Sequence, residues 1–194
     1  MLIEITLKPD SFTPTLLSNT QSFKSNLNAF EQYAVLPGSR WGASFTWTNR
    51  KGAEARALTG QLANLQGQVN TFKIKIPADL IGTADGTGVV NGSGQTGTEV
   101  ITDGWAPGQP LLFAAGDWIE IDQAVYLVTA DVSSDGSGNA IIPIAPPIRR
   151  SPPDGASVVS DASFYMRPTK PNSANFNFTG AQVYATSIAG REID

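Results

Sequence analysis

The chain has 194 residues, which suits one domain or two small ones and is enough to bury roughly 70% of the surface of the unfolded chain. Its charged fraction is 15%, against a usual value of about 25%, and its 19 glycines and 13 prolines indicate many turns and short elements. The net charge of −4 is too small for general electrostatic adhesion to nucleic acid or anionic membranes. We therefore expect a turn-rich protein dominated by β-structure.

Histidine and cysteine are both absent from the sequence. The lack of histidine excludes a Ser–His–Asp triad, an imidazole base and the usual zinc or iron sites. The lack of cysteine excludes a thiolate nucleophile, an iron–sulfur cluster and a disulfide framework. Catalysis would have to use carboxylate, lysine, tyrosine or N-terminal chemistry.

The first eight residues alternate like a strand, with Ile3, Ile5 and Leu7 on one face, and we expect this strand to lie at a sheet edge. They lack a basic region ahead of an apolar core, and no apolar run approaches ~20 residues, so we expect no signal peptide and no membrane span. We expect the protein to be made in the cytoplasm. Residues 10–20, rich in Ser, Thr, Asn and Pro, are interpreted as a long loop.

A strand, a helix and a second strand are expected next. Residues 40–48 alternate cleanly, with Trp41 and Trp47 on the apolar side. Apolar residues then recur at helical spacing, which predicts the one substantial helix at about residues 50–66, with Asn49 as its N-cap and Gly67 at a left-handed C-cap. Residues 71–76 alternate again before Pro77.

The remaining sequence suggests a small β-insert followed by a return to the first sheet. Residues 82–110 are dense in glycine, and residues 131–139 are typical of a hairpin turn. Strand-like runs occur at 117–121, 125–129, 140–144 and 183–188, and Phe176 and Phe178 alternate with asparagines. We predict one domain from residues 1–80 plus 166–194 and an inserted domain from residues 81–165, with hinges near Gly82–Gly88 and Arg167–Pro168.

Two loop motifs imitate binding sites. Residues 92–97 match GxGxxG, but the residues that follow favour a strand, whereas dinucleotide binding needs a helix there. Asp131, Ser133, Asp135 and Gly136 resemble the start of a calcium loop, but its twelfth position is Ile142 instead of glutamate. We interpret both motifs as β-connections without cofactor or metal.

Candidate sugar-processing residues are similarly weak. Asp117, Glu120 and Asp122 could supply paired carboxylates, but we interpret them as surface carboxylates. The four tryptophans could stack on sugar rings, but Trp41 and Trp47 share the apolar stripe of a strand, and we also favour core positions for Trp105 and Trp118. Residues 143–146 match PxxP but continue a strand. We assign no catalytic, cofactor-binding or metal-binding residue.

An ordered set of segments nevertheless resembles a known family. The segments are Arg40-Trp41 with Phe45, Leu62 with Leu65-Gln66-Gly67, Phe72, residues 88–97, residues 115–119, Tyr126 to Val128, Asp135 to Gly138, and residues 142–149. In this order they resemble the distal tail proteins of long-tailed bacteriophages and prophages, over roughly residues 35–165 and more loosely at both ends.

The resemblance implies a structural virion protein that forms a ring, typically sixfold, at the junction of tail tube and tail tip. Residues 1–80 plus 166–194 would be a tail-tube-like, ring-forming domain of β-sandwich type with one helix. Residues 81–165 would be a small OB-like or galectin-like β-domain. The implied partners are further copies of the chain in a homohexamer, the tail tube protein and the tip or baseplate hub proteins, with genomic DNA passing through the channel without specific binding.

Three functions are therefore in competition. The first is the phage-tail ring protein, or a neighbouring minor tail or hub protein. The second is a carbohydrate-binding host-attachment module of the tail, which would need exposed Trp105 or Trp118. The third is an enzyme such as a cell-wall glycosidase, which no motif supports, so we expect no enzymatic activity. The low charged fraction favours the first, because uncharged polar surface is buried between subunits at low desolvation cost.

Overall fold

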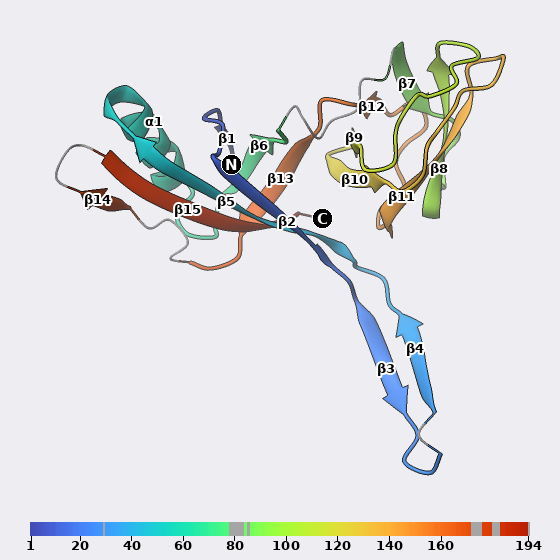
Figure 1. Ribbon diagram of the computed structural model, residues 1–194, viewed down its shortest axis with the longest axis horizontal. Helices are drawn as coiled ribbons and strands as arrows, with labels where there is room; N and C mark the ends of the chain where they lie inside the picture. Colours follow the sequence, from blue (N-terminus) through green and yellow to red (C-terminus); the bar gives the residue numbers. More distant parts are fainter. Residues whose placement is uncertain (29, 78–83, 85, 172–175, 180–182, 194) are drawn as a thin grey trace.

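The computed structural model describes residues 1–194 except 29, 78–83, 85, 172–175, 180–182 and 194. The described chain is mainly β with one α-helix, which confirms the predicted fold class. Figure 1 shows three regions: a body that contains the helix, a second group of strands beside it, and a thin hairpin that projects away from both.

The body is a seven-stranded sheet with the order β1–β6–β13–β15–β5–β2, and β14 pairs with β15. Its strands are β1 (Leu2–Ile5), β2 (Ser11–Leu17), β5 (Arg40–Arg50), β6 (Thr71–Lys75), β13 (Ser163–Pro168), β14 (Asn177–Thr179) and β15 (Val183–Glu192). All pairings are antiparallel except β1 with β6. The first strand lies at an edge, as the sequence predicts.

The helix α1 (Gly52–Ala63) covers the body core. It buries Ala55, Leu58 and Leu62, the residues whose spacing predicted it. The prediction of Asn49 as N-cap is wrong: Lys51 occupies the N-cap without a side-chain cap, and Asn49 belongs to β5 with a φ of 55°. In the part of the chain that the structure describes, this 12-residue helix is shorter than a membrane-spanning helix needs to be.

The second sheet has six strands in the order β12–β9–β10–β11–β8–β7. They are β7 (Gly86–Val90), β8 (Gly97–Trp105), β9 (Trp118–Ile121), β10 (Ala124–Val128), β11 (Ala140–Ile148) and β12 (Val158–Val159). The sheet has its own core, which includes Trp105, Phe113 and Ile142. Residues 131–139 join the paired strands β10 and β11, as the predicted hairpin turn requires.

The chain returns from the second sheet to the body at Ser163, where β13 begins to pair with β6. The expected return hinge at Arg167–Pro168 is wrong, because both residues are paired with β15 inside β13. The other expected hinge begins at Gly82, which lies outside the described residues. The two sheets are in contact, because Trp118 and Val125 of the second sheet pack into the body core, with the Trp118 ring 4.6 Å from that of Trp41 between centroids.

The predicted loop at residues 10–20 is wrong. Residues 11–17 form β2, which pairs with β5 at seven consecutive positions from Ser11–Thr46 to Leu17–Arg40. The composition of this segment resembles that of a loop, but Pro14 and polar residues are also tolerated in an edge strand, where one side of the backbone has no neighbour.

Beyond β2 and β5 the same two chain segments continue as the projecting hairpin, residues 18–39, with strands β3 (Thr20–Lys24) and β4 (Glu31–Val35). We call residues 18–39 the arm.

Candidate assembly surface

The arm exposes apolar side chains without a core of its own. Its strands form a separate two-stranded sheet, and their residues are exposed except Ala34, which is half-buried. The exposed fractions are 58% for Phe23, 99% for Leu27, 72% for Phe30, 71% for Tyr33 and 71% for Val35. These exposed apolar side chains make the arm the candidate interaction surface of the chain.

Backbone pairing holds the arm together. The β3–β4 ladder is extended at the tip by the Ser25 amide, which donates to Phe30 at 2.9 Å, and at the base by the Leu36 amide, which donates to Asn19 at 2.7 Å. An isolated two-stranded hairpin has marginal stability in water, since it buries little apolar surface. Contacts with a partner would supply the burial that the arm lacks.

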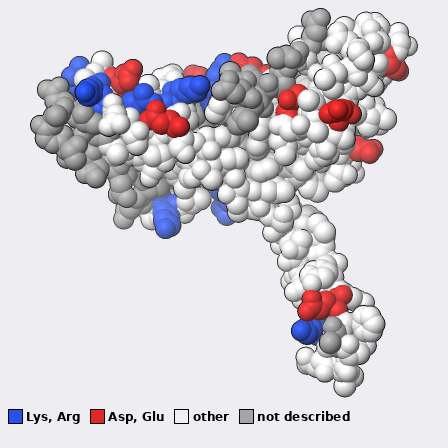
Figure 2. Space-filling model, viewed as in Figure 1, with Lys and Arg blue, Asp and Glu red and all other residues white. Residues whose placement is uncertain are grey.

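The arm is almost free of charge. Lys24 and Glu31 are its only charged residues, and their Nζ and Oε1 atoms pair at 3.5 Å. Figure 2 shows the arm as a projection with charged atoms only toward its far end. A surface with no excess of cations does not attract the phosphates of nucleic acid. The combination of aromatic, aliphatic and uncharged polar side chains is typical of a protein interface.

The exposed area is large for a protein of this size. The chain has an accessible surface of 10498 Å² and a mass of 20.5 kDa. A compact monomer of that mass exposes about 8,900 Å², so the excess is roughly 1,600 Å². This excess is close to the total area that a standard protein interface buries, about 1,600 Å².

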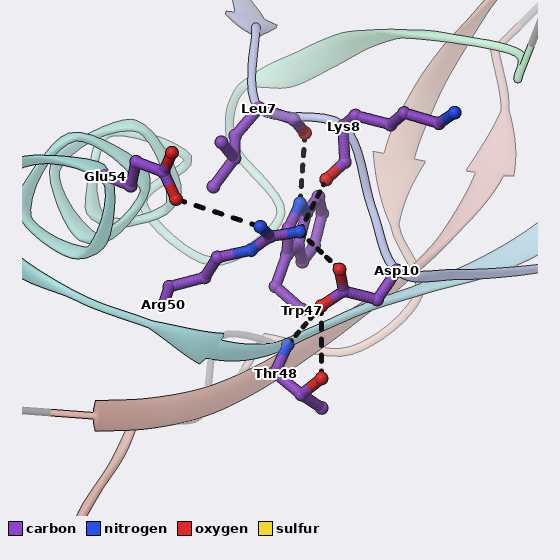
Figure 3. A network of polar contacts seen from close by, with 7 residues as sticks. All are labelled: Leu7, Lys8, Asp10, Trp47, Thr48, Arg50 and Glu54. Carbon is purple, nitrogen blue, oxygen red and sulfur yellow. Dashed lines mark hydrogen bonds and ion pairs between the residues drawn. The ribbon is translucent and has the colours of Figure 1, made fainter.

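A polar network fixes the base of β2 to the body (Figure 3). The Asp10 carboxylate accepts hydrogen bonds from the Thr48 amide at 2.6 Å and the Thr48 hydroxyl at 3.1 Å, and it pairs with the Arg50 guanidinium. Arg50 also donates to the Lys8 carbonyl at 3.1 Å and lies 3.7 Å from Glu54 of α1. The network thus anchors β2 and β5 to the helix side of the body at the ends of these strands that lie away from the arm.

A buried carboxylate joins the body to the second sheet. Glu192, in β15, is 1% exposed. Its Oε2 accepts from the Trp41 amide at 3.3 Å and pairs with Arg149 at 2.9 Å, while its Oε1 accepts from the Val125 amide at 2.7 Å. Burial raises the pKa of the Glu192 carboxyl, against the opposing effect of these donors and of Arg149. These contacts tie β5, β10 and the end of β11 to one side chain, and no sequence motif indicated it.

The loop motifs are β-connections. The glycine-rich segment 92–97 joins the antiparallel strands β7 and β8, so no helix N-terminus meets a pyrophosphate there. In the calcium-like loop, Asp135 accepts from the amides of Ser137 and Asn139 and from the Asn139 side chain, each at 2.8 Å. These bonds lower the pKa of the Asp135 carboxyl, with the Asn139 side chain as the largest cause. Among the described residues, no group of three or more His, Cys, Asp or Glu side chains is placed to hold a metal ion.

The carboxylates singled out from the sequence have structural contacts. Asp117 accepts from the Ala114 amide at 2.9 Å, and Asp122 pairs with Arg150 at 3.0 Å. Glu120, like Asp117, is half-buried, so neither is a fully exposed surface carboxylate; the Glu120 Oε2 accepts from the Ser163 amide at 3.0 Å. Burial raises the pKa of Glu120. Each of the three therefore holds a turn or a strand in place.

All four tryptophans lie in cores, as the sequence predicts. Trp105 is 4% and Trp118 is 5% exposed. The Trp105 ring lies edge-on to Phe113 with 5.3 Å between centroids, its indole nitrogen donates to the Thr102 hydroxyl at 2.8 Å, and a Cβ on Gly88 would come within 2.1 Å of its ring atoms. Neither ring presents a face to a sugar.

No protein-family model and no curated protein sequence matches the chain. The arm is thus the candidate functional site on the strength of its own geometry. The sequence contained no clear signal for it, since Phe23, Leu27 and Phe30 lie at a helical spacing whereas Tyr33 and Val35 lie at a strand spacing.

Proposed function

We propose that the chain is a structural subunit that assembles with copies of itself into a closed ring, most simply of six subunits, at the distal end of a bacteriophage tail. The resemblance of the sequence to distal tail proteins supplies the location. The single observation that carries the assembly is the arm, with five large apolar side chains exposed and no core beneath them. The ring would join the tail tube to the tip or hub proteins.

The remaining surface is compatible with a channel through which DNA passes. The net charge of −4 gives the chain no general attraction for the DNA backbone. Among the strands that the structure describes, β1 and β2 are the end strands of the body sheet, and a neighbouring subunit can pair with their outer edges. In a ring, the edge strand of one subunit can pair with that of the next, whereas a monomer exposes both edges.

The carbohydrate-binding alternative receives no support from its candidate residues, because Trp105 and Trp118 are buried. An enzymatic function likewise gains nothing from Asp117, Glu120 and Asp122, whose contacts hold turns and strands.

The test is electron microscopy of the purified chain and of virions that carry it. At high protein concentration we expect rings with a central channel, and in virions we expect the chain as a ring at the tail end, located by an antibody or a gold-labelled tag. A chain that stays monomeric at every concentration and is present in virions as one copy, or outside the tail, would end this proposal.

A further inference from the structure

The two faces of the arm both carry exposed apolar side chains. In an antiparallel pair, directly opposed residues share a face and successive residues alternate. Thr20 opposes Val35 and Ser22 opposes Tyr33, so Tyr33 and Val35 lie on one face, which we call the Tyr33 face. Phe23 opposes Gln32 on the other face, which we call the Phe23 face.

Neither face is covered by the chain's own body. Tyr33, Val35 and Phe23 are 58–71% exposed, and none of them belongs to either hydrophobic core. A strand ribbon laid on a single surface would bury one face and leave the other in water. The arm therefore needs either a deep cleft or two separate surfaces to cover both faces.

None of three pockets lined by described residues is large enough to be a cleft of this kind. They enclose about 850, 900 and 770 Å³ of empty space, and the last of them lies at the arm tip itself. A five-residue ribbon is roughly 17 Å long and, with its side chains, about 10 Å thick, which requires on the order of 1,500 Å³. One further copy of the chain cannot enclose the arm in any of these three pockets.

Given the proposed self-assembly, on which this step rests, we propose that each arm is clamped between two other copies of the chain, with the Tyr33 face against one copy and the Phe23 face against the other. The near absence of charge favours protein over nucleic acid as the occupant. The chain as a whole exposes roughly 1,600 Å² more than a compact monomer of its mass, which leaves enough surface for contacts with further copies.

The absence of native cysteine makes single-cysteine labelling a clean test. The variants Val35→Cys and Phe23→Cys report on the two faces, and Val69→Cys is the control, since Val69 is 68% exposed and lies outside the arm. Maleimide labelling is compared between dilute protein and assembled protein. We expect assembly to slow the labelling of both arm cysteines at least tenfold and to leave the control unchanged.

Cross-linking then counts the neighbours. Each arm cysteine is given a benzophenone label, and the labelled chain is mixed with a tenfold excess of unlabelled wild-type chain before assembly. After irradiation, denaturing gels should show dimers for Val35→Cys and for Phe23→Cys, and trimers for the double variant.

The possible failures are distinguishable. Dimers without trimers from the double variant, or rapid labelling of one face in a ring that forms normally, would overturn the clamp and leave the ring intact. Light scattering that shows no assembly at any concentration, with all cysteines labelled equally fast and one copy of the chain per virion, would overturn both the clamp and the proposed function. If the unassembled protein floats with phosphatidylcholine vesicles and the Leu27→Ser variant does not, a membrane is the occupant of the arm. That result would also overturn the clamp.

Discussion

The arm and the second sheet are both built from antiparallel strands joined by turns, yet they treat apolar side chains in opposite ways. The second sheet buries Trp105, Phe113 and Ile142 in a core of its own. The arm leaves Phe23 and Tyr33 largely exposed. Backbone pairing is therefore common to both regions, and burial is what separates a self-supporting sheet from one that requires a partner.

The contrast extends to how each region is joined to the body. The second sheet is fastened by Trp118 in the body core and by the Glu192 contacts. The arm continues two body strands, β2 and β5, and Asp10 and Arg50 join the ends of these strands that lie away from the arm. Substitutions in the second sheet should thus affect folding, while those in the arm should affect assembly.

The largest effect is expected from truncation of the chain after residue 165. This removes β15, which pairs with both β13 and β5, and it removes Met166 and Ile188 from the body core. We expect a fragment of residues 1–165 to lose the cooperative unfolding of its body, while a fragment of residues 81–165 folds around the second core. Near-ultraviolet circular dichroism and urea unfolding measure both fragments. Wild-type cooperativity in the longer fragment would show that residues 166–194 are dispensable for the body.

A single core substitution should have the next largest effect. Trp105→Ala removes a buried ring that packs on Phe113 and a hydrogen bond to Thr102. Its expected cost is about 3–5 kcal/mol in the free energy of unfolding of the second sheet. The matched arm variant Phe23→Ala, which removes an exposed ring, should cost less than about 0.5 kcal/mol in the monomer. Similar losses for the two variants in thermal unfolding would abolish the distinction between the regions.

The sequence predicted the strands with a clean local pattern. Residues 40–48 and 71–76 alternate because each has one face in the body core. The period of α1 was likewise readable from Leu58 and Leu62. These elements carry their own signal, since the face that they bury is a periodic property of a few neighbouring residues.

What the sequence did not predict depends on distant partners. β2 is a strand because it pairs with β5, whose partner residues are 23 to 35 positions later in the chain. The role of Glu192 depends on donors from β5 and β10, which lie far from it in sequence. The arm escaped prediction for a third reason: its apolar residues are spread over both faces, so neither face shows the alternation of a half-buried strand.

A smaller effect is expected from pH at the Glu192 contacts. Burial raises the pKa of Glu192 above its ordinary value of 4.5, so the folded state holds the proton more tightly than the unfolded state. The contribution of this group to stability is fully present below pH 4.5 and is lost as pH rises through the folded pKa. The free energy of unfolding, measured with urea between pH 4 and 8, should therefore depend on pH. The Glu192→Gln variant should lack the part of this pH dependence that comes from Glu192.

The matched control for that experiment is Glu99→Gln, which changes an exposed glutamate of β8. It should leave the pH slope of the wild type unaltered. Because burial also raises the pKa of Glu120, the Glu192→Gln variant should keep a residual slope of the same sign. A slope that is equal in the Glu192→Gln variant and the wild type would show that Glu192 titrates alike in the folded and unfolded states.

The smallest effect on folding, and the sharpest comparison, is expected from two valines. Val35, on the arm, and Val69, on the body, are 71% and 68% exposed. Each Val→Ser substitution should change the free energy of unfolding of the monomer by less than about 0.5 kcal/mol, because neither side chain is in a core. Only Val35→Ser should weaken association, since burying a valine contributes about 1.5–3 kcal/mol, which corresponds to roughly tenfold or more in the dissociation constant. Sedimentation velocity over a concentration series measures the difference. Equal association of the two variants would mean that the Tyr33 face of the arm stays in water in the assembled protein, and the apolar side chains there would then need an occupant other than a second copy.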